Sequence, residues 1–162
     1  MKVKLTYNEV NPPSFNTPLG MTGDIYGNLY IADHLNHKIR KLDREGHVTT
    51  YAGSGTEGST NGANTTARFS YPWELAADSS GNIYVTDAGT HLIRKIDSNG
   101  TVTTIAGSGS AGSTDGQGTS ASFSTPRGIA VDSSGNVYVS DLNNHKIRRI
   151  DPSGYVTTRA GT

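Results

Sequence analysis

The chain has 162 residues, and its 14 basic and 14 acidic side chains give a formal net charge of zero with no basic run. This charge balance argues against nucleic acid as a partner, because neutralised phosphates supply most of the affinity for nucleic acids, and no apolar stretch approaches the roughly 18 residues of a membrane span. Cysteine is absent, which excludes disulfides and thiolate metal sites, and 20 glycines beside only 33% hydrophobic residues are typical of short strands joined by many turns rather than of helices.

Residues 1–14 form an N-terminal extension. Residues 2–7 alternate between lysine or threonine and apolar side chains, which predicts an edge strand, and Asn11-Pro12-Pro13 then ends it. Two interpretations remain open: a clasp across a junction between chains, or a remnant of a neighbouring domain. Because no apolar signal segment is present, we expect a cytoplasmic protein or an exported one whose signal is not part of this sequence.

From residue 15 onward, one sequence pattern occurs three times at a spacing of 54 residues. Each copy starts with Phe-x-x-Pro, at Phe15, Phe69 and Phe123, and self-similarity at a fixed period is the signature of a repeat architecture. We therefore divide the chain into 15–68, 69–122 and 123–162, the first two each ending in a long loop rich in Gly, Ser and Thr. The other recurring polar positions are Asp24, Asp78 and Asp132; His37, His91 and His145; Arg40, Arg94 and Arg148.

Within a unit, the hydrophobic pattern is that of strands. In the third copy we expect strands at 128–132, 137–140, 146–150 and 155–158, separated by turns in which Asp and Ser bond their own backbone and Gly supplies positive φ. Four short antiparallel strands make one twisted blade. A single blade cannot cover both its faces, so the blades are expected to stack radially as in a β-propeller.

The repeated unit resembles the NHL repeat, which is named after an Asn-His-Leu motif. The motif stands here as Asn36-His37-Lys38, Thr90-His91-Leu92 and Asn144-His145-Lys146. The resemblance implies a six-bladed propeller that serves as a binding scaffold, although a minority of relatives are enzymes. Two features depart from the common pattern: Glu74 replaces a family glycine, and the loops 53–68 and 107–122 are as long as those of bacterial members.

Three blades do not close a ring, so the first and the third would each expose an apolar face. Because 162 is a whole number of repeats, we predict an all-β fold of three four-stranded blades, half of a six-bladed propeller closed by a homodimer. An open fragment of a longer protein and closure by a different partner are the alternatives.

The repeated polar residues are interpreted as structural. One histidine per blade is spread round the ring, whereas a metal needs its ligands around one point, so we expect each His to hold a loop through hydrogen bonds and expect no metal or cofactor. The recurring Asp and Arg residues suit turns and links between blades. His34 adds a His-x-x-His with His37 in the first blade alone, which is weak as a metal motif.

Candidate binding residues are found where the copies differ. The start of each blade reads Leu19-Gly20, Trp73-Glu74 or Arg127-Gly128, and the loop between the second and third strands carries His34 only in the first blade. These loops share one face of the propeller. Trp73, the only tryptophan, with Glu74, Arg127, Leu19 and His34 suits a protein, peptide, sugar or small polar ligand; the other interpretation is that Trp73 only packs over a blade junction.

Three functions remain open. The first, which we favour, is a non-enzymatic scaffold that binds a protein or small ligand on the divergent face. The second is an enzyme of the lyase or lactonase kind, which would need metal ligands in the channel, where the first strands offer mainly Gly, Ala, Thr and Met. The third is a purely structural or engineered repeat module without a ligand of its own.

Overall fold

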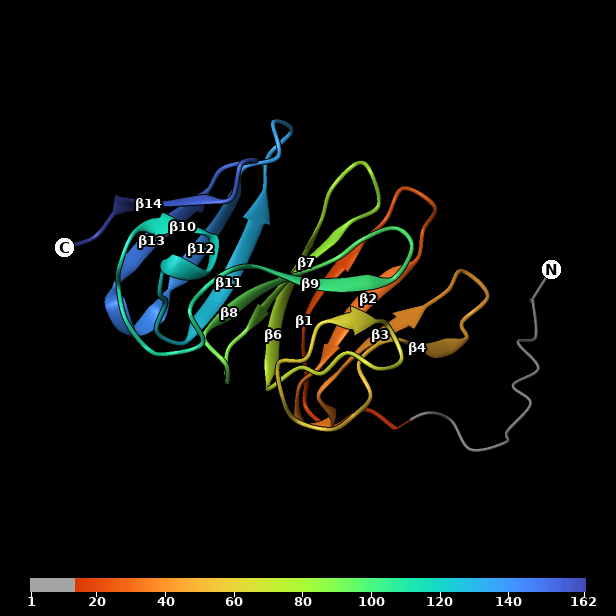
Figure 1. The fold of residues 1–162 in the computed structure, drawn as a ribbon. Coiled ribbons are helices and arrows are strands. Elements are labelled where there is room, and N and C mark those ends of the chain that lie inside the picture. The colour runs from red at the N-terminus through yellow and green to blue at the C-terminus, as the bar shows by residue number, and fades with distance from the viewer. Residues whose placement is uncertain (1–13) are drawn as a thin grey trace.

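The computed structural model describes residues 14–162, so the strand expected at residues 2–7 lies outside the described part of the chain. Three antiparallel sheets follow one another along the sequence (Figure 1). Blade 1 is a four-stranded sheet with its strands in chain order. Its strands are β1 (Pro18–Gly23), β2 (Leu29–Asp33), β3 (Lys38–Leu42) and β4 (Val48–Ala52).

Blades 2 and 3 repeat this meander, and each gains a short fifth strand on its outer edge, which the sequence pattern did not predict. Blade 2 contains β6 (Pro72–Ala77), β7 (Ile83–Asp87), β8 (Leu92–Ile96), β9 (Thr101–Ala106) and the edge strand β5 (Gly62–Ala63). Blade 3 contains β11 (Pro126–Val131), β12 (Val137–Asp141), β13 (Lys146–Ile150), β14 (Tyr155–Ala160) and the edge strand β10 (Gly116–Gln117).

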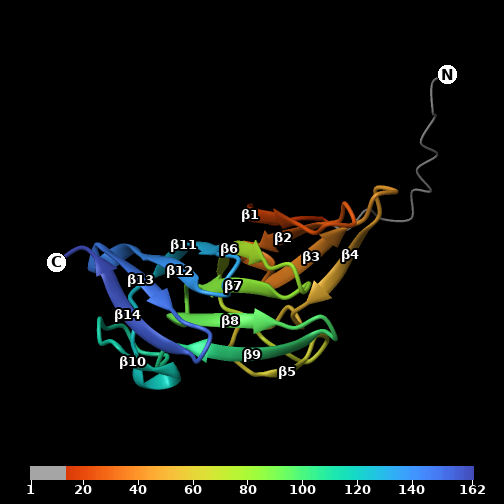
Figure 2. The same ribbon diagram turned by 90° about the horizontal axis from the view of Figure 1, so that it is seen from above.

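The helical segments among the described residues are three-residue 3₁₀ turns, as expected for so glycine-rich a chain. They are η1 (His34–Asn36), η2 (Gly118–Ser120) and η3 (Leu142–Asn144). The innermost strands β1, β6 and β11 lie side by side, and the outer strands β4, β9 and β14 fan away from them (Figure 2). The prediction of all-β propeller blades, each with four main strands, is confirmed.

A carboxylate organises the turn between the first and second strands of each blade. In blade 2, Asp78 Oδ1 accepts hydrogen bonds from the backbone N–H groups of Ser80 and Asn82, and Oδ2 accepts from the Asn82 amide at 2.7 Å and from the Tyr84 hydroxyl at 3.1 Å. Gly81 takes a φ of +81°, a left-handed conformation that favours glycine. The same bonds recur around Asp24 and Asp132.

The hydrophobic core lies between the blades. Phe69 at the start of blade 2 is fully buried in a cluster with Ile39 and Ala52 of blade 1. Phe123 of blade 3 is buried in the same way with Ile93 of blade 2. Because burying one such side chain stabilises a fold by about 1.5–3 kcal/mol, each blade depends on its neighbour for its stability.

The long loops are fastened to the blade that follows them. Strand β5 pairs with β9, so the loop that leaves blade 1 ends on the outer edge of blade 2. The Arg94 guanidinium donates to Thr60 O at 3.2 Å and to Asn61 Oδ1 at 2.8 Å, which fixes this loop from inside the blade. Arg148 binds Thr114 and Asp115 in the next loop in the same way.

Candidate functional site

Two of the repeated histidines join neighbouring blades. His37 Nδ1 accepts a hydrogen bond of 3.3 Å from the backbone N–H of Tyr71, and His91 Nδ1 accepts one of 3.1 Å from the N–H of Thr125. The two donor residues, Tyr71 and Thr125, stand just before the first strand of the next blade, and both have a left-handed φ of 54°. Each histidine therefore belongs to a different blade junction, and the three do not form a common site.

The repeated Asp and Arg residues form one buried ion pair inside each blade. The Arg94–Asp87 contact measures 3.1 Å and the Arg148–Asp141 contact 2.8 Å, and all four side chains are fully buried; Arg40 and Asp33 are 3.6 Å apart. Asp87 Oδ1 also accepts from the Ser70 N–H at 2.7 Å, which holds the start of the blade. Burial raises the pKa of Asp87 to about 6. This geometry accounts for the recurrence of the pair without any catalytic role.

The divergent residues stand at a β-bulge in the first strand of each blade. The pairing of β1 with β2 shifts register between Pro18 and Met21, and the equivalent shift occurs in β6 and β11. A bulge re-aims the side chains it carries and is common next to functional sites. Trp73 and Arg127 occupy equivalent bulge positions in adjacent blades, where their side chains meet.

Three predicted residues come together as a tryptophan cluster, which we define as His34, Trp73 and Arg127. The Arg127 Cζ atom lies 3.9 Å from the centroid of the Trp73 ring, a stacked cation–π contact. The His34 ring meets the Trp73 ring edge-on at 5.1 Å, and its Nδ1 lies 3.1 Å from Pro72 O. One side chain comes from each blade, so the cluster exists only because the blades stack.

Arg127 differs from the repeated arginines in its partners. It takes part in none of the ion pairs found among residues 14–162, and its guanidinium donates none of the hydrogen bonds found there; its buried Nε lacks a partner, as does the Nε of Arg40, Arg94 and Arg148. The Arg94 guanidinium, by contrast, donates four hydrogen bonds. Because Nε is buried, the terminal N–H groups of Arg127 are the donors that remain for an acceptor from outside the described chain.

Glu74 and Leu19 take no part in the recorded contacts of the tryptophan cluster. The Glu74 backbone approaches Gly20 so closely that a Cβ atom on Gly20 would lie 2.6 Å from the Glu74 Cα, and Glu74 Oε1 accepts from the Leu75 N–H at 3.2 Å. Leu19 is half-buried at the bulge of β1. Thr86, which sequence reasoning missed, positions both neighbours: its Oγ1 donates to Arg127 O at 2.6 Å and accepts from the Glu74 N–H at 3.1 Å.

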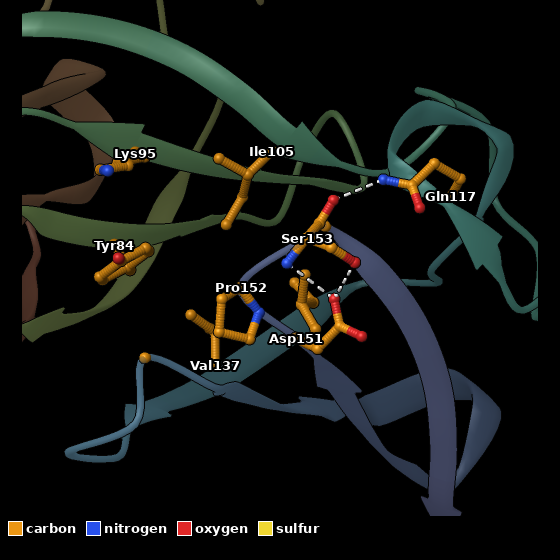
Figure 3. Close-up of a pocket in the computed structure, with 11 residues that line it drawn as sticks. Tyr84, Lys95, Ile105, Gln117, Val137, Asp151, Pro152 and Ser153 are labelled. Atoms are coloured by element: carbon orange, nitrogen blue, oxygen red, sulfur yellow. Dashed lines mark hydrogen bonds between the residues drawn. The ribbon is translucent and has the colours of Figure 1, made fainter.

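The opposite face carries a groove at each blade junction. Between blades 2 and 3, a cavity of about 300 Å³ is lined by Tyr84, Lys95 and Ile105 on one side and by the β13–β14 turn on the other (Figure 3). Gln117 reaches across to donate to Ser153 O at 2.6 Å. A matching cavity of about 360 Å³ lies between blades 1 and 2. Because the groove repeats with the blades, stacking geometry explains it.

Among residues 14–162, one group of three side chains brings its possible metal ligands close enough together to hold an ion. Asp43, Glu45 and His47 lie on the exposed β3–β4 turn, with ligand atoms within 4.8 Å of one another. The turn itself already uses the Asp43 carboxylate, which accepts from the N–H groups of Glu45 and His47. This group lies outside the tryptophan cluster. No described helix is long and apolar enough to span a membrane.

The three stacked sheets show that the molecule is a repeat protein built from β-propeller blades. A family model for the NHL repeat matches residues 69–96 and 123–150, which are the second and third blades. The chain belongs to the NHL-repeat family.

Two curated relatives illustrate this membership. The chain is 33% identical over 149 residues to the chloroplastic protein SUPPRESSOR OF QUENCHING 1 of Arabidopsis thaliana, a match that covers 85% of the chain and 14% of the plant protein. It is 39% identical over 84 residues to human NHL repeat-containing protein 2, covering 49% of the chain and 12% of that relative. The chain thus spans a small part of the relatives that it matches.

Solved structures show the same fold. A protein of unknown function from Bacteroides thetaiotaomicron is 25% identical with a TM-score of 0.76, over 90% of this chain and 37% of that one. An auxiliary nutrient binding protein from Bacteroides ovatus is 26% identical with a TM-score of 0.66, and the match covers 82% of this chain and 35% of that protein. The virginiamycin B lyase of Staphylococcus aureus shares the fold alone. It is 18% identical with a TM-score of 0.61, and the match covers 88% of this chain and 40% of the lyase.

Proposed function

We propose that the chain is a non-enzymatic propeller scaffold that binds a small polar ligand with an anionic group at the tryptophan cluster. The observation that carries this proposal is the Arg127 guanidinium, which stacks on Trp73 without an acceptor among the described residues. Trp73 and Arg127 stand in the rigid strands β6 and β11, and His34 stands on the turn after β2; side chains held in this way by a rigid scaffold commonly form binding sites.

The chemistry of the cluster favours a carboxylate or a similar oxyanion on a flat or ring-shaped ligand. A guanidinium that stacks through its face leaves its N–H groups in the plane, where two parallel bonds to a carboxylate form. The Trp73 ring and the edge of His34 offer an apolar surface beside these donors. An acidic sugar or the acidic side chain of a peptide fits both features.

The structural neighbours support binding more than catalysis. An auxiliary nutrient binding protein from Bacteroides ovatus is 26% identical, whereas the lyase is 18% identical and shares only the fold. The group of potential metal ligands described above sits on an exposed turn away from the inner strands. We further propose that the three blades form half of a six-bladed ring, because they fan from one line of inner strands (Figure 2).

Trp73 is the only tryptophan, so its fluorescence reports directly on the site. We expect glucuronate or an acidic dipeptide to change the emission saturably and glucose to have little effect. Arg127→Leu should weaken the response to the acidic probes by about 10-fold or more, because a hydrogen bond to a charged group contributes about 1.5–3 kcal/mol.

Arg44→Leu is the matched control, since Arg44 is an exposed arginine on the β3–β4 turn and should leave binding unchanged. Emission that stays constant with every probe at millimolar concentration would overturn the proposal, as would an equal response from the Arg127→Leu protein. A response to glucose equal to that with glucuronate would retain binding but remove the anionic requirement, and with it this assignment.

A further inference from the structure

The two outer flanks of the arc expose residues that are buried at the inner junctions. We call the side of blade 1 that carries Phe15 the front face, and the side of blade 3 that carries Ile147 the rear face. Phe15 is 38% exposed, whereas its equivalents Phe69 and Phe123 are 0% exposed. Ile147 is 42% exposed, although Ile39 and Ile93 at the same position in blades 1 and 2 are 0% exposed.

The rear face contains a hollow where the inner junctions hold a phenylalanine. Its volume is about 240 Å³, and Ile147, Ala160 and Gly161 line it. At the first junction, the equivalents Ile39 and Ala52 pack around Phe69, and the Phe69 ring lies so near Gly53 that a Cβ there would be 3.2 Å from it. By this equivalence, the hollow is a socket for a phenylalanine at the start of another blade.

The polar groups of the two faces also match. His145 is equivalent to the two histidines that accept a backbone N–H across a junction, and within residues 14–162 its ring nitrogens have no partner. Thr17 has the φ of 54° that both donors share, and its N–H has no partner in the same part of the chain. At a junction between two copies, the Thr17 N–H of one copy would donate a hydrogen bond to the His145 ring of the other.

A hydroxyl bond extends this match to the inner strands. At the second junction, Thr86 Oγ1 donates to the carbonyl of Arg127. Ser140 is the equivalent of Thr86 on the rear face, where its Oγ accepts from the Gly128 N–H at 2.7 Å and keeps its own proton to donate. The equivalent acceptor on the front face is the carbonyl of Leu19.

We infer that the front face docks on the rear face of a second copy of this chain, and that the reciprocal contact closes a two-fold symmetric ring. The second copy is the occupant because it offers, in register, the phenylalanine, the left-handed threonine and the carbonyl that continue the inner junctions. Closed two-fold symmetry leaves neither face uncovered. This inference rests on the six-bladed ring proposed above but not on the ligand site.

Light scattering on the 162-residue chain tests the inference. We expect a mass of twice 17.1 kDa for the unchanged protein. Phe15→Lys alters the front face and Ile147→Glu the rear face, and each should shift the mass to that of a monomer. An equimolar mixture of the two variants should restore the dimer, because one junction is then unchanged and the other pairs a lysine with a glutamate.

Ile25→Glu is the matched control, since Ile25 is 81% exposed on a turn whose equivalents Ser79 and Ser133 are also exposed. It should remain a dimer. Circular dichroism checks that the variants fold, which we expect because both altered side chains are outside the inner junctions. A monomeric unchanged protein at about 100 µM, loss of the dimer in only one flank variant, or no recovery on mixing would each overturn the inference. Trp73 emission is read separately, so failure of the ligand proposal is distinguishable from failure of the ring.

Discussion

The repeated ion pairs and the tryptophan cluster use the same residue type in opposite ways. Arg94 is fully buried and directs its donors to Asp87, Arg68, Thr60 and Asn61 within the chain. Arg127 is half-buried and stacked on Trp73, and its guanidinium has no acceptor among the described residues. The contrast shows that the guanidinium of a recurring arginine binds acceptors within the chain, whereas the guanidinium of Arg127, which departs from the repeat, is left without an acceptor among the described residues.

The largest expected effect is on folding. Arg94→Leu should reduce the free energy of unfolding by about 3–5 kcal/mol, because it leaves the Asp87 carboxylate buried without its cation. Arg127→Leu should cost less than about 2 kcal/mol, the size of a partly desolvated cation–π contact. Urea denaturation at one fixed protein concentration compares the two variants. Equal losses of stability would contradict this distinction between the recurring arginines and Arg127.

The loss in Arg94→Leu should depend on pH. Burial already raises the pKa of Asp87 to about 6, above the ordinary 3.8, and removal of the cation raises it further. The folded variant then binds a proton more tightly than the unfolded chain does. Its stability is therefore favoured at low pH and lost as pH rises through the folded pKa, so the deficit relative to the unchanged protein should be smaller at pH 5 than at pH 7. A stability deficit that is the same at pH 5 and pH 7 would contradict the view that the Asp87 carboxylate causes the loss.

The fold was predictable because local signals agree with one another. The spacing of Phe69, Asp78 and His91 repeats in every unit, and each of these residues has a role inside its blade or at the next junction. The edge strands β5 and β10 were not predictable, since two residues carry no periodicity and their partners β9 and β14 lie far along the sequence.

The next largest expected effect is on the stability of variants at two equivalent histidines, His91 and His145. His91→Ala should cost about 1 kcal/mol, the usual contribution of one hydrogen bond, because His91 accepts the Thr125 N–H across an inner junction. His145→Ala should have a similar cost where two copies pair and almost none where the chain is monomeric. Thermal unfolding at several protein concentrations separates these cases. A cost for His145→Ala that does not change with concentration would place its partner within the same chain.

The candidate site was predictable only in part. Trp73, Arg127 and His34 stand out as departures from the repeat, and the stacking of blades brings them together. The place of Glu74 against Gly20 was not predictable, because it depends on the close approach of β1 and β6 at the bulge. Thr86 escaped notice because Ala32 and Ser140 at the equivalent positions make it look like an ordinary small residue of a strand.

The smallest expected effect concerns a repeated turn. The Asn136 side-chain amide, together with backbone N–H groups, holds the pKa of Asp132 below its ordinary value. Such a carboxylate contributes stability above the unfolded pKa of 3.8, and this is lost as pH falls through the folded pKa. Asn136→Ala should therefore move the Asp132 titration, followed by carboxyl carbon NMR, toward the ordinary value. Asp78, which keeps Asn82, is the internal control in the same spectra. If Asp132 titrates unchanged, backbone donors alone set its pKa, and the recurring asparagine would need another explanation.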